Sequence, residues 1–317
     1  MKILFVTATR IGDAVLSTSL LGYLIDRYPG ARFTIAAGPI AAPLFEAVPG
    51  LERLIVVAKQ KMSRHWLKLW REVVGRNWDL VIDLRGSALV YLLWARERRV
   101  MAKGDPSEHR VQQLARLYSL DPPPAPRLWT EPEHEARAGA LIPAGAPILA
   151  IGPAANWRGK QWRAERFAEL AQRLIAEGPF RQSRVAVMAA EHERSQAQPL
   201  LDALPPERRI DLVGEVDLLT AAAILRRSQL FIGNDTGLMH VAAASGVPTL
   251  GLFGPGLPAQ YAPWGPHTAM VFTEIPAREL LGTPGFDHRT TDTLMDSLSV
   301  EAVEAAALKL FQRSVPR

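Results

Sequence analysis

Residues 230–248 read LFIGNDTGLMHVAAASGVP, and the rest of the chain can be interpreted outward from this run. Its apolar beginning predicts a buried strand, its polar middle a tight turn, and its small residues a helix that ends at Gly246. Asn234 or Asp235 is suited to cap this helix. Unpaired N–H groups and the positive end of the helix dipole would then point out of the turn, where a diphosphate binds well.

Several polar groups gather at this turn. Thr236 and His240 are four residues apart on the expected helix, so both would face the same ligand, and Gly237 lets a ligand approach the backbone. The alternative is an ordinary capped helix, with His240 packed between helix and sheet. Capping needs only one such polar residue, so the density of polar groups favours a binding site.

Strands alternate with helical segments on both sides of this run, which is typical of doubly wound α/β domains. The strands are expected at residues 2–7, 32–36, 54–57 and 80–84, and then at 148–152, 184–188, 210–213, 230–233 and 249–253.

The chain of 317 residues is expected to form two domains. Residues 121–146 are rich in Pro and Ala and are interpreted as a linker. The N-terminal domain would therefore span 1–145 with this linker, and the C-terminal domain 146–317. Open α/β sheets bind ligands outside the carboxyl ends of their strands, so a cleft is expected at those ends of both sheets.

Composition sets further bounds. The chain has no cysteine, which excludes disulfides and thiolate metal sites. Its first residues begin like a signal peptide, but Arg10 and Asp13 interrupt the apolar run. Apolar stretches such as 88–95 are too short to span a membrane. We expect a soluble, cytoplasmic protein.

Positive charge is concentrated in one window of the chain. The net charge is +5, and residues 51–118 hold 14 Lys/Arg against 7 Asp/Glu. Such a window attracts polyanions, which include nucleic acid, anionic lipid and phosphorylated sugars. The alternative is a basic face that serves solubility only.

The central run also carries a resemblance. Asp235–His240, then Ala242 and Ala243, Gly246–Pro248 and the LFGP sequence at 252–255 resemble the signature of the ADP-heptose:lipopolysaccharide heptosyltransferases, glycosyltransferase family 9. Other segments match too: GDAVLST at 12–18, DLRGS at 83–87 and the Lys-x-Trp element within NWRGKQW at 156–162.

The resemblance implies the GT-B fold, in which two Rossmann-like doubly wound domains face a central cleft. It also implies that a terminal helix, expected at about 300–311, crosses back to the first domain. The implied activity is inverting, metal-independent transfer of a heptose or related sugar from an ADP-linked donor. The acceptor would be an anionic lipopolysaccharide inner-core or similar glycan.

The family's catalytic base corresponds to Asp13. Inversion at a sugar carbon needs one carboxylate that takes the proton of the acceptor hydroxyl. From the residues alone, a cap of the helix that follows is the favoured interpretation of Asp13.

The resemblance also assigns the donor site. Lys160 would neutralise a phosphate, whereas alone it could be a solvated loop lysine. Thr236 and the Gly237 N–H would bind the diphosphate. Asp235 would accept hydrogen bonds from the sugar hydroxyls, and His240 would contact the phosphate or the sugar. The family has Pro after the Trp of the Lys-x-Trp element, where this chain has Arg163.

The nucleoside part of the donor is assigned less specifically. An acidic residue after the strand ending at Met188 would bind the ribose, and Glu191 and Glu193 both fit, with Glu193 favoured. Val216 lies in a segment that resembles the loop contacting the adenine.

The acceptor is expected to lie against basic residues of the N-terminal domain, although each of them alone could simply be solvated. These residues are Lys59, Lys61, Arg64, Arg85, Arg98 and Arg99. Arg85 replaces the common Gln of the family's segment. Trp66, Trp70, Trp78 and Trp94 lie nearby in sequence and are core residues or a lipid-facing edge.

The expected partners are a nucleotide-sugar donor and an anionic glycolipid, with peripheral contact at the inner face of the inner membrane and no nucleic acid. No metal site or cofactor is expected, because His192 and His240 are isolated and no D-x-D follows a strand. The first strand lacks G-x-G-x-x-G, which argues against a nicotinamide enzyme. Two alternatives remain: a nucleotide-sugar epimerase, and a non-catalytic protein that binds sugar nucleotides or nucleic acid.

Overall fold

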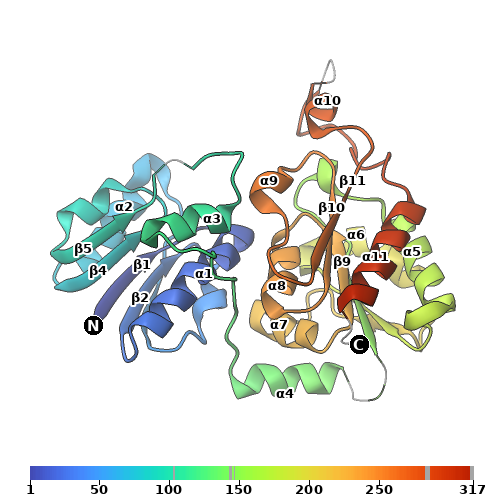
Figure 1. Ribbon diagram of the computed structural model, residues 1–317, viewed down its shortest axis with the longest axis horizontal. Coiled ribbons are helices and arrows are strands. Elements are labelled where there is room, and N and C mark those ends of the chain that lie inside the picture. Colours follow the sequence, from blue (N-terminus) through green and yellow to red (C-terminus); the bar gives the residue numbers. More distant parts are fainter. Residues whose placement is uncertain (103, 143–144, 146, 283–285, 315–317) are drawn as a thin grey trace. The chain divides into compact units, whose positions relative to one another are not determined.

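The computed structural model describes residues 1–102, 104–142, 145, 147–282 and 286–314 (Figure 1). The chain divides into two compact units, Met1–Glu131 and Pro132–Arg317. Among the described residues, none of the helices combines the length and apolar character needed to cross a bilayer.

The first unit is built on a five-stranded parallel sheet with the strand order β3-β2-β1-β4-β5. Its strands are β1 (Lys2–Val6), β2 (Arg32–Ala37), β3 (Leu51–Val56), β4 (Trp78–Asp83) and β5 (Ala95–Val100). Its helices are α1 (Ile11–Arg27), α2 (Arg64–Val73) and α3 (Arg110–Ala115), with 3₁₀ turns η1 (Ala42–Phe45), η2 (Lys61–Ser63), η3 (Ala88–Leu92) and η4 (Arg116–Tyr118).

The second unit has a six-stranded parallel sheet with the order β11-β10-β9-β6-β7-β8. Its strands are β6 (Ile148–Gly152), β7 (Arg184–Val187), β8 (Arg209–Asp211), β9 (Leu230–Asn234), β10 (Thr249–Phe253) and β11 (Thr268–Phe272). Its helices are α4 (Pro132–Leu141), α5 (Ala164–Ala176), α6 (Arg194–Ala203), α7 (Leu218–Arg226), α8 (Gly237–Ser245), α9 (Pro258–Tyr261), α10 (Ala277–Leu281) and α11 (Val300–Ser314), with η5 (Arg158–Lys160), η6 (Gly178–Phe180) and η7 (Glu191–Glu193).

Each sheet has its own core, as expected for two domains. The central strands are continuous apolar runs, because helices cover both faces of a parallel sheet. All residues of β6, β9 and β10 are buried, and β1 is buried from its second residue on. The doubly wound α/β class predicted from the sequence is therefore confirmed for both units.

The strand order identifies where a ligand is expected. In the first sheet the connections diverge between β1 and β4, and in the second between β6 and β9. Open parallel sheets bind ligands at such switch points, outside the carboxyl ends of the strands. The loops in these positions carry Arg85, Lys160 and Asp235, and the first turn of α1, which follows β1, carries Asp13.

Two features of the second unit bear on the expected domain organisation. The boundary between the compact units lies at Glu131/Pro132, within the expected linker 121–146, and α4 packs against α7 of the second unit. The terminal helix expected at about 300–311 is α11. Its residues Val303, Ala307 and Leu310 are buried in the core of the second unit, where α11 packs on α5 and β11 (Figure 1).

Candidate active site

The turn after β9 is braced by Asn234. This residue is fully buried, accepts a hydrogen bond from the Trp162 backbone N–H (3.1 Å) and donates one to the Pro153 carbonyl (2.8 Å). Asn234 therefore ties the loop after β6 to the turn after β9 and does not cap α8, which corrects one of the two caps proposed from the sequence.

The N-terminus of α8 is open at its cap. The N-cap residue is Thr236, in an extended conformation and without a side-chain capping bond, and the helix begins at Gly237. Neither Asn234 nor Asp235 therefore holds the cap position. The first-turn amides and the positive end of the dipole remain directed at the carboxyl edge of the sheet, which is the arrangement that binds anions.

Lys160 and Asp235 meet at this helix N-terminus. The Lys160 Nζ lies 2.5 Å from the Asp235 Oδ2, and the Asp235 side chain is only 7% exposed. A side chain at Gly256 would collide with the same carboxylate, since its Cβ would lie 2.4 Å from Oδ2. The sequence analysis expected Lys160 to contact a phosphate and Asp235 to contact the sugar. In the structure the two side chains form an ion pair, and this pair holds the Lys160 ammonium beside the N-terminus of α8.

The loop that carries Lys160 is held by hydrogen bonds and ion pairs to residues within 288–298. Trp162 is buried and its Nε1 donates to the Leu298 carbonyl (2.9 Å). Arg158 pairs with Asp292 at 2.7 Å, and this guanidinium is the main cause that lowers the pKa of Asp292 to about 2. These contacts keep the ammonium of Lys160 in place.

Arg163 stands where the resemblance placed a proline. Its φ is −58°, which lies in the range that proline imposes, and it is the N-cap residue of α5. Its guanidinium pairs with Asp296 at 2.6 Å. The departure from the family pattern therefore keeps the backbone conformation and adds an ion pair.

The two glutamates expected near the ribose differ in surroundings. The Glu193 carboxylate accepts a hydrogen bond from the Ala190 N–H (3.0 Å), which makes it part of the local turn. Glu191 lies against Gly214, where an added Cβ would approach its Oε2 to 2.0 Å. Glu191 is thus the one that reaches the segment containing Val216, which is half-buried just before the α7 cap, Asp217.

His240 lies in the second turn of α8 and is 4% exposed. This burial agrees with the packing interpretation of the residue. It gives His240 little surface for a direct contact with a sugar.

In the first unit, Asp13 lies in the first turn of α1, after the carboxyl end of β1. The N-cap position belongs to Arg10, and no side-chain capping bond is formed there. Among the described residues, none forms a hydrogen bond or ion pair with the half-buried Asp13 carboxylate. The capping alternative is therefore wrong, and the carboxylate remains available as a base.

A hollow of about 620 Å³ opens at the carboxyl ends of β4 and β5. Its shape depends on the buried Asp83, which accepts hydrogen bonds from the backbone N–H groups of Arg85 (2.8 Å) and Ser87 (2.6 Å). Gly86 completes this turn with a φ of +61°, a conformation that favours glycine. We call the hollow the arginine pocket, because Arg85 and Arg110 both line it.

Arg85 is partly withdrawn from water in this pocket. Its guanidinium carbon lies 4.5 Å from the centre of the Trp66 ring, and burial lowers the pKa of Arg85 from its usual value. An arginine nevertheless stays charged at neutral pH. Sequence reasoning missed Arg110, because it begins the short helix α3 and belongs to no motif.

The other basic residues expected at the acceptor fall into two groups. Lys59, Lys61 and Arg64 are exposed in the segment that follows β3. Arg98 and Arg99 lie within β5 and are engaged elsewhere.

Arg98 donates to the carbonyls of Val90 (3.0 Å) and Leu93 (2.5 Å), so it supports the chain around η3. Arg99 pairs with Glu97 at 2.6 Å. The role in acceptor binding expected for these two arginines stays a prediction.

A model of the family described as glycosyltransferase family 9 (heptosyltransferase) matches residues 91–282, which is more than half of the chain. The chain belongs to glycosyltransferase family 9. It is therefore a glycosyltransferase, and this membership sets aside the epimerase and the non-catalytic alternatives.

Relatives of this family 9 enzyme match along most of its length. Lipooligosaccharide heptosyltransferase 2 of Haemophilus influenzae is 26% identical over 309 residues, which cover 83% of this chain and 86% of the relative. Lipopolysaccharide heptosyltransferase 2 of Escherichia coli K12 is 27% identical over 317 residues, covering 87% and 88%.

The structure of E. coli ADP-heptose lps heptosyltransferase II is similar at a TM-score of 0.77 and 22% identity, with 99% of each chain covered. This likeness confirms the GT-B fold predicted from the sequence. No group of three or more His, Asp or Glu side chains suited to a metal ion is found in the part of the chain described here.

Proposed function

We propose that this family 9 enzyme transfers a heptose from an ADP-linked donor to an anionic lipopolysaccharide inner-core acceptor, with inversion at the sugar carbon. Its relatives from H. influenzae and E. coli are heptosyltransferases of lipooligosaccharide and lipopolysaccharide. The similar E. coli structure is that of an ADP-heptose enzyme. These relationships support the substrate class.

The observation that carries the proposal is the pair of Lys160 and Asp235 at the N-terminus of α8. A diphosphate at this position would meet the ammonium of Lys160 and the amides that begin at Gly237. Asp235 would hold the ammonium in place and accept hydrogen bonds from the sugar hydroxyls. Glu191 and Val216 would contact the nucleoside, with Glu191 replacing Glu193 as the preferred ribose ligand.

Transfer would proceed by one displacement. The Asp13 carboxylate takes the proton from the acceptor hydroxyl while its oxygen bonds to the anomeric carbon. The bond from that carbon to the diphosphate oxygen breaks, and the electron pair leaves with ADP. Lys160 and the α8 amides stabilise the charge that develops on the leaving diphosphate.

We further propose that this chemistry needs no metal ion or cofactor. The leaving group already has a fixed cation and a helix N-terminus to stabilise it. These groups can supply the positive charge that a divalent ion supplies in other nucleotide-sugar enzymes.

The donor is tested by calorimetric titration of the full chain with ADP-, UDP- and GDP-linked sugars. We expect the ADP-linked heptose to bind most tightly, and EDTA to leave its affinity unchanged. Tighter binding of a UDP- or GDP-linked sugar would overturn the donor assignment. Loss of binding in EDTA, restored by a divalent ion, would overturn the metal-free proposal.

The acceptor is assigned to the arginine pocket. Arg85 and Arg110 present two guanidinium groups to a hollow of about 620 Å³, large enough for an acidic sugar. Arginine recognises carboxylate and phosphate by paired hydrogen bonds. Lys59, Lys61 and Arg64 would attract the acceptor's further negative charges from the segment after β3.

Replacing either Arg85 or Arg110 with glutamine is expected to raise the acceptor KM by about 10- to 100-fold, because each charge-assisted hydrogen bond contributes about 1.5–3 kcal/mol. The donor KM should stay unchanged. Arg76→Gln is a suitable control. Arg76 lies before the amino end of β4, whereas the arginine pocket is at the carboxyl end, and Arg76 pairs with Glu52. Steady-state kinetics with each substrate varied in turn measure both constants, and an unchanged acceptor KM would contradict the assignment.

A further inference from the structure

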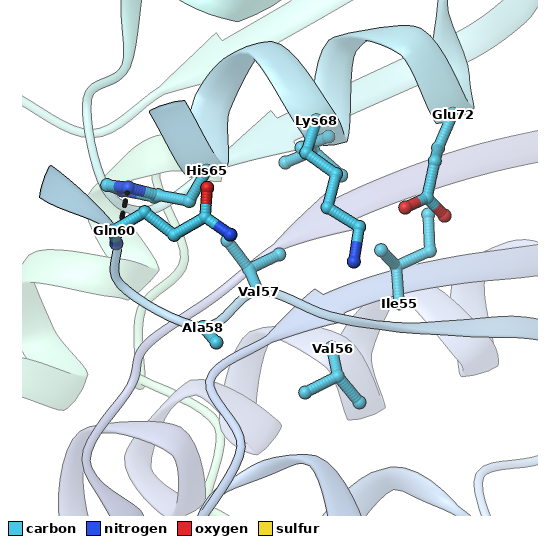
Figure 2. A pocket seen from close by; sticks show the side chains of 9 residues that line it. Ile55, Val56, Val57, Ala58, Gln60, His65, Lys68 and Glu72 are labelled. Atoms are coloured by element: carbon cyan, nitrogen blue, oxygen red, sulfur yellow. Dashed lines mark hydrogen bonds between the residues drawn. The ribbon is translucent and has the colours of Figure 1, made fainter. Parts of the chain in front are cut away.

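The first unit has a small hollow between α2 and β3, apart from the arginine pocket (Figure 2). Lys68 and Glu72 are directed from α2 toward β3, and His65 accepts a hydrogen bond from the Gln60 N–H (3.3 Å). The hollow has only about 20 Å³, which is enough for one water molecule and not for a sugar. It therefore does not compete with the arginine pocket as an acceptor site.

The arginine pocket has one side that the sequence motifs do not explain. Its lining there includes Gly104 and Arg110, which lie before α3 and at its first residue. Gln113 belongs to the same helix, does not line the pocket, and has a side chain that is only 6% exposed. A buried amide needs hydrogen-bond partners within the protein, so its partners show what it holds in place.

The Gln113 amide connects Arg110 with the segment before the helix. Its Oε1 accepts a hydrogen bond from the Arg110 Nη1 (3.1 Å). Its Nε2 donates to the carbonyls of Asp105 and Glu108 (2.7 Å each). These bonds use both donors of the amide and one lone pair of its oxygen. The amide is thus anchored by the segment and in turn fixes the direction of the Arg110 guanidinium.

The segment approaches Gln113 so closely that a glycine is required. A Cβ added at Gly104 would lie 2.1 Å from the Gln113 Oε1, so any other residue there would displace the amide or the segment. The segment therefore packs directly on the oxygen that receives the Arg110 bond. This packing limits the directions in which that oxygen can point.

Gln113 orients Arg110 without cancelling its charge. Among the described residues, none of the carboxylates forms an ion pair with the Arg110 guanidinium. A carboxylate in place of the Gln113 amide would neutralise the arginine, whereas the neutral amide leaves the full positive charge available to an anion. A guanidinium that is already held in one orientation also loses less conformational entropy when a ligand binds.

We propose that Gln113 is a positioning residue for acceptor binding. Its amide holds the Arg110 guanidinium in the direction from which it pairs with an acidic group of the acceptor. Gln113 acts through Arg110 and has no contact with the substrate of its own. The inference rests on the proposed function, because the arginine pocket is assigned to the acceptor there.

The test is a double-mutant cycle on the full chain with Gln113→Met, Arg110→Gln and the two together. Methionine resembles glutamine in length and removes all three hydrogen bonds of the amide. The acceptor KM, the donor KM and kcat are measured for each variant. Circular dichroism establishes that each is folded. Gln113→Asn keeps an amide that is too short to bridge its partners, and it provides a second test if methionine prevents folding.

Gln112→Met is the matched control. Gln112 is the exposed neighbour in the same helix, and its Oε1 accepts a hydrogen bond from the His109 N–H (3.2 Å) at the helix cap. Its replacement removes a capping bond and no contact with Arg110. The control therefore separates a weakened α3 from a misdirected guanidinium.

We expect Gln113→Met to raise the acceptor KM by about 3- to 10-fold, because the hydrogen bond that orients the guanidinium is lost. The donor KM and kcat should stay unchanged, as should the acceptor KM of Gln112→Met. In the Arg110→Gln background, Gln113→Met should have a much smaller effect, because its partner is already absent. An unchanged acceptor KM in Gln113→Met would overturn the proposal. An equal rise in both backgrounds, or in the control, would show a merely structural role and overturn it as well.

A measurement without substrate separates this inference from the proposed function. Nitrogen NMR of arginine-labelled protein follows rotation of the Arg110 guanidinium about its Cζ–Nη bonds, and the signal is assigned by its loss in Arg110→Gln. We expect slow rotation in the native chain and in Gln112→Met, and faster rotation in Gln113→Met. Equal rotation in all three would overturn the positioning role. A native acceptor KM in Arg110→Gln would instead overturn the acceptor assignment of the pocket, and the inference with it, even where the rotation changes.

Discussion

Replacing Asp13 with asparagine is expected to reduce the rate of heptose transfer by about 10²- to 10⁴-fold, the usual contribution of a general base. The affinity for the ADP-linked donor should not change, because the donor groups lie in the second unit. Asparagine keeps the size of the side chain and cannot take a proton. The Asp13 carboxylate has no capping bond to lose, so the fold should be unaffected.

Single-turnover rates at saturating donor and acceptor measure this loss, and calorimetry measures donor affinity. Asp26→Asn is the matched control, because Asp26 lies in the last turn of the same helix and pairs with Arg127 at 2.8 Å. The control should transfer heptose at the native rate. Turnover retained by Asp13→Asn would show that another group is the base.

Replacing Lys160 with glutamine is expected to have two effects. The donor KM should rise by about 10- to 100-fold, since a charge-assisted contact to the diphosphate is lost. The free energy of unfolding of the second unit should fall by about 1–3 kcal/mol, because the Asp235 carboxylate, 7% exposed, loses its partner. Donor-dependent kinetics and thermal unfolding measure the two effects.

The double variant separates binding from stability. Asp235→Asn in addition to Lys160→Gln removes the unpaired carboxylate, so stability should return toward the native value while the donor KM stays high. Lys309→Gln, an exposed lysine of α11, is the control for loss of a positive charge. A donor KM that remains native in Lys160→Gln would contradict the phosphate assignment.

Much of the fold could be predicted from the sequence because the buried strands are continuous apolar runs. The strands expected at 148–152 and 249–253 coincide with β6 and β10. The edge strands β5 and β11 were missed. Strand β5 reads ARERRV, and an edge strand with one covered face can be highly charged.

Candidate site residues could be predicted where they belong to a sequence motif. They could not be predicted where their position depends on contacts between residues far apart in the sequence. Asp13, Lys160 and Asp235 were found from motifs, and the structure places them at the switch points of the two sheets. The pairing of Lys160 with Asp235 joins residues 75 positions apart and leaves no local pattern. No local pattern links Arg110 to Arg85, and none indicates the bonds from Arg98 to the Val90 and Leu93 carbonyls.

The central claim is that one bond to the diphosphate is exchanged for one bond to an acceptor, with Asp13 as the base. It is tested most directly by following ADP-heptose and a heptose-free inner-core acceptor in one tube by proton and phosphorus NMR. The account predicts one ADP for each new glycosidic bond, with anomeric configuration opposite to that of the donor. A retained configuration, or an epimerised donor sugar in solution without ADP release, would contradict it.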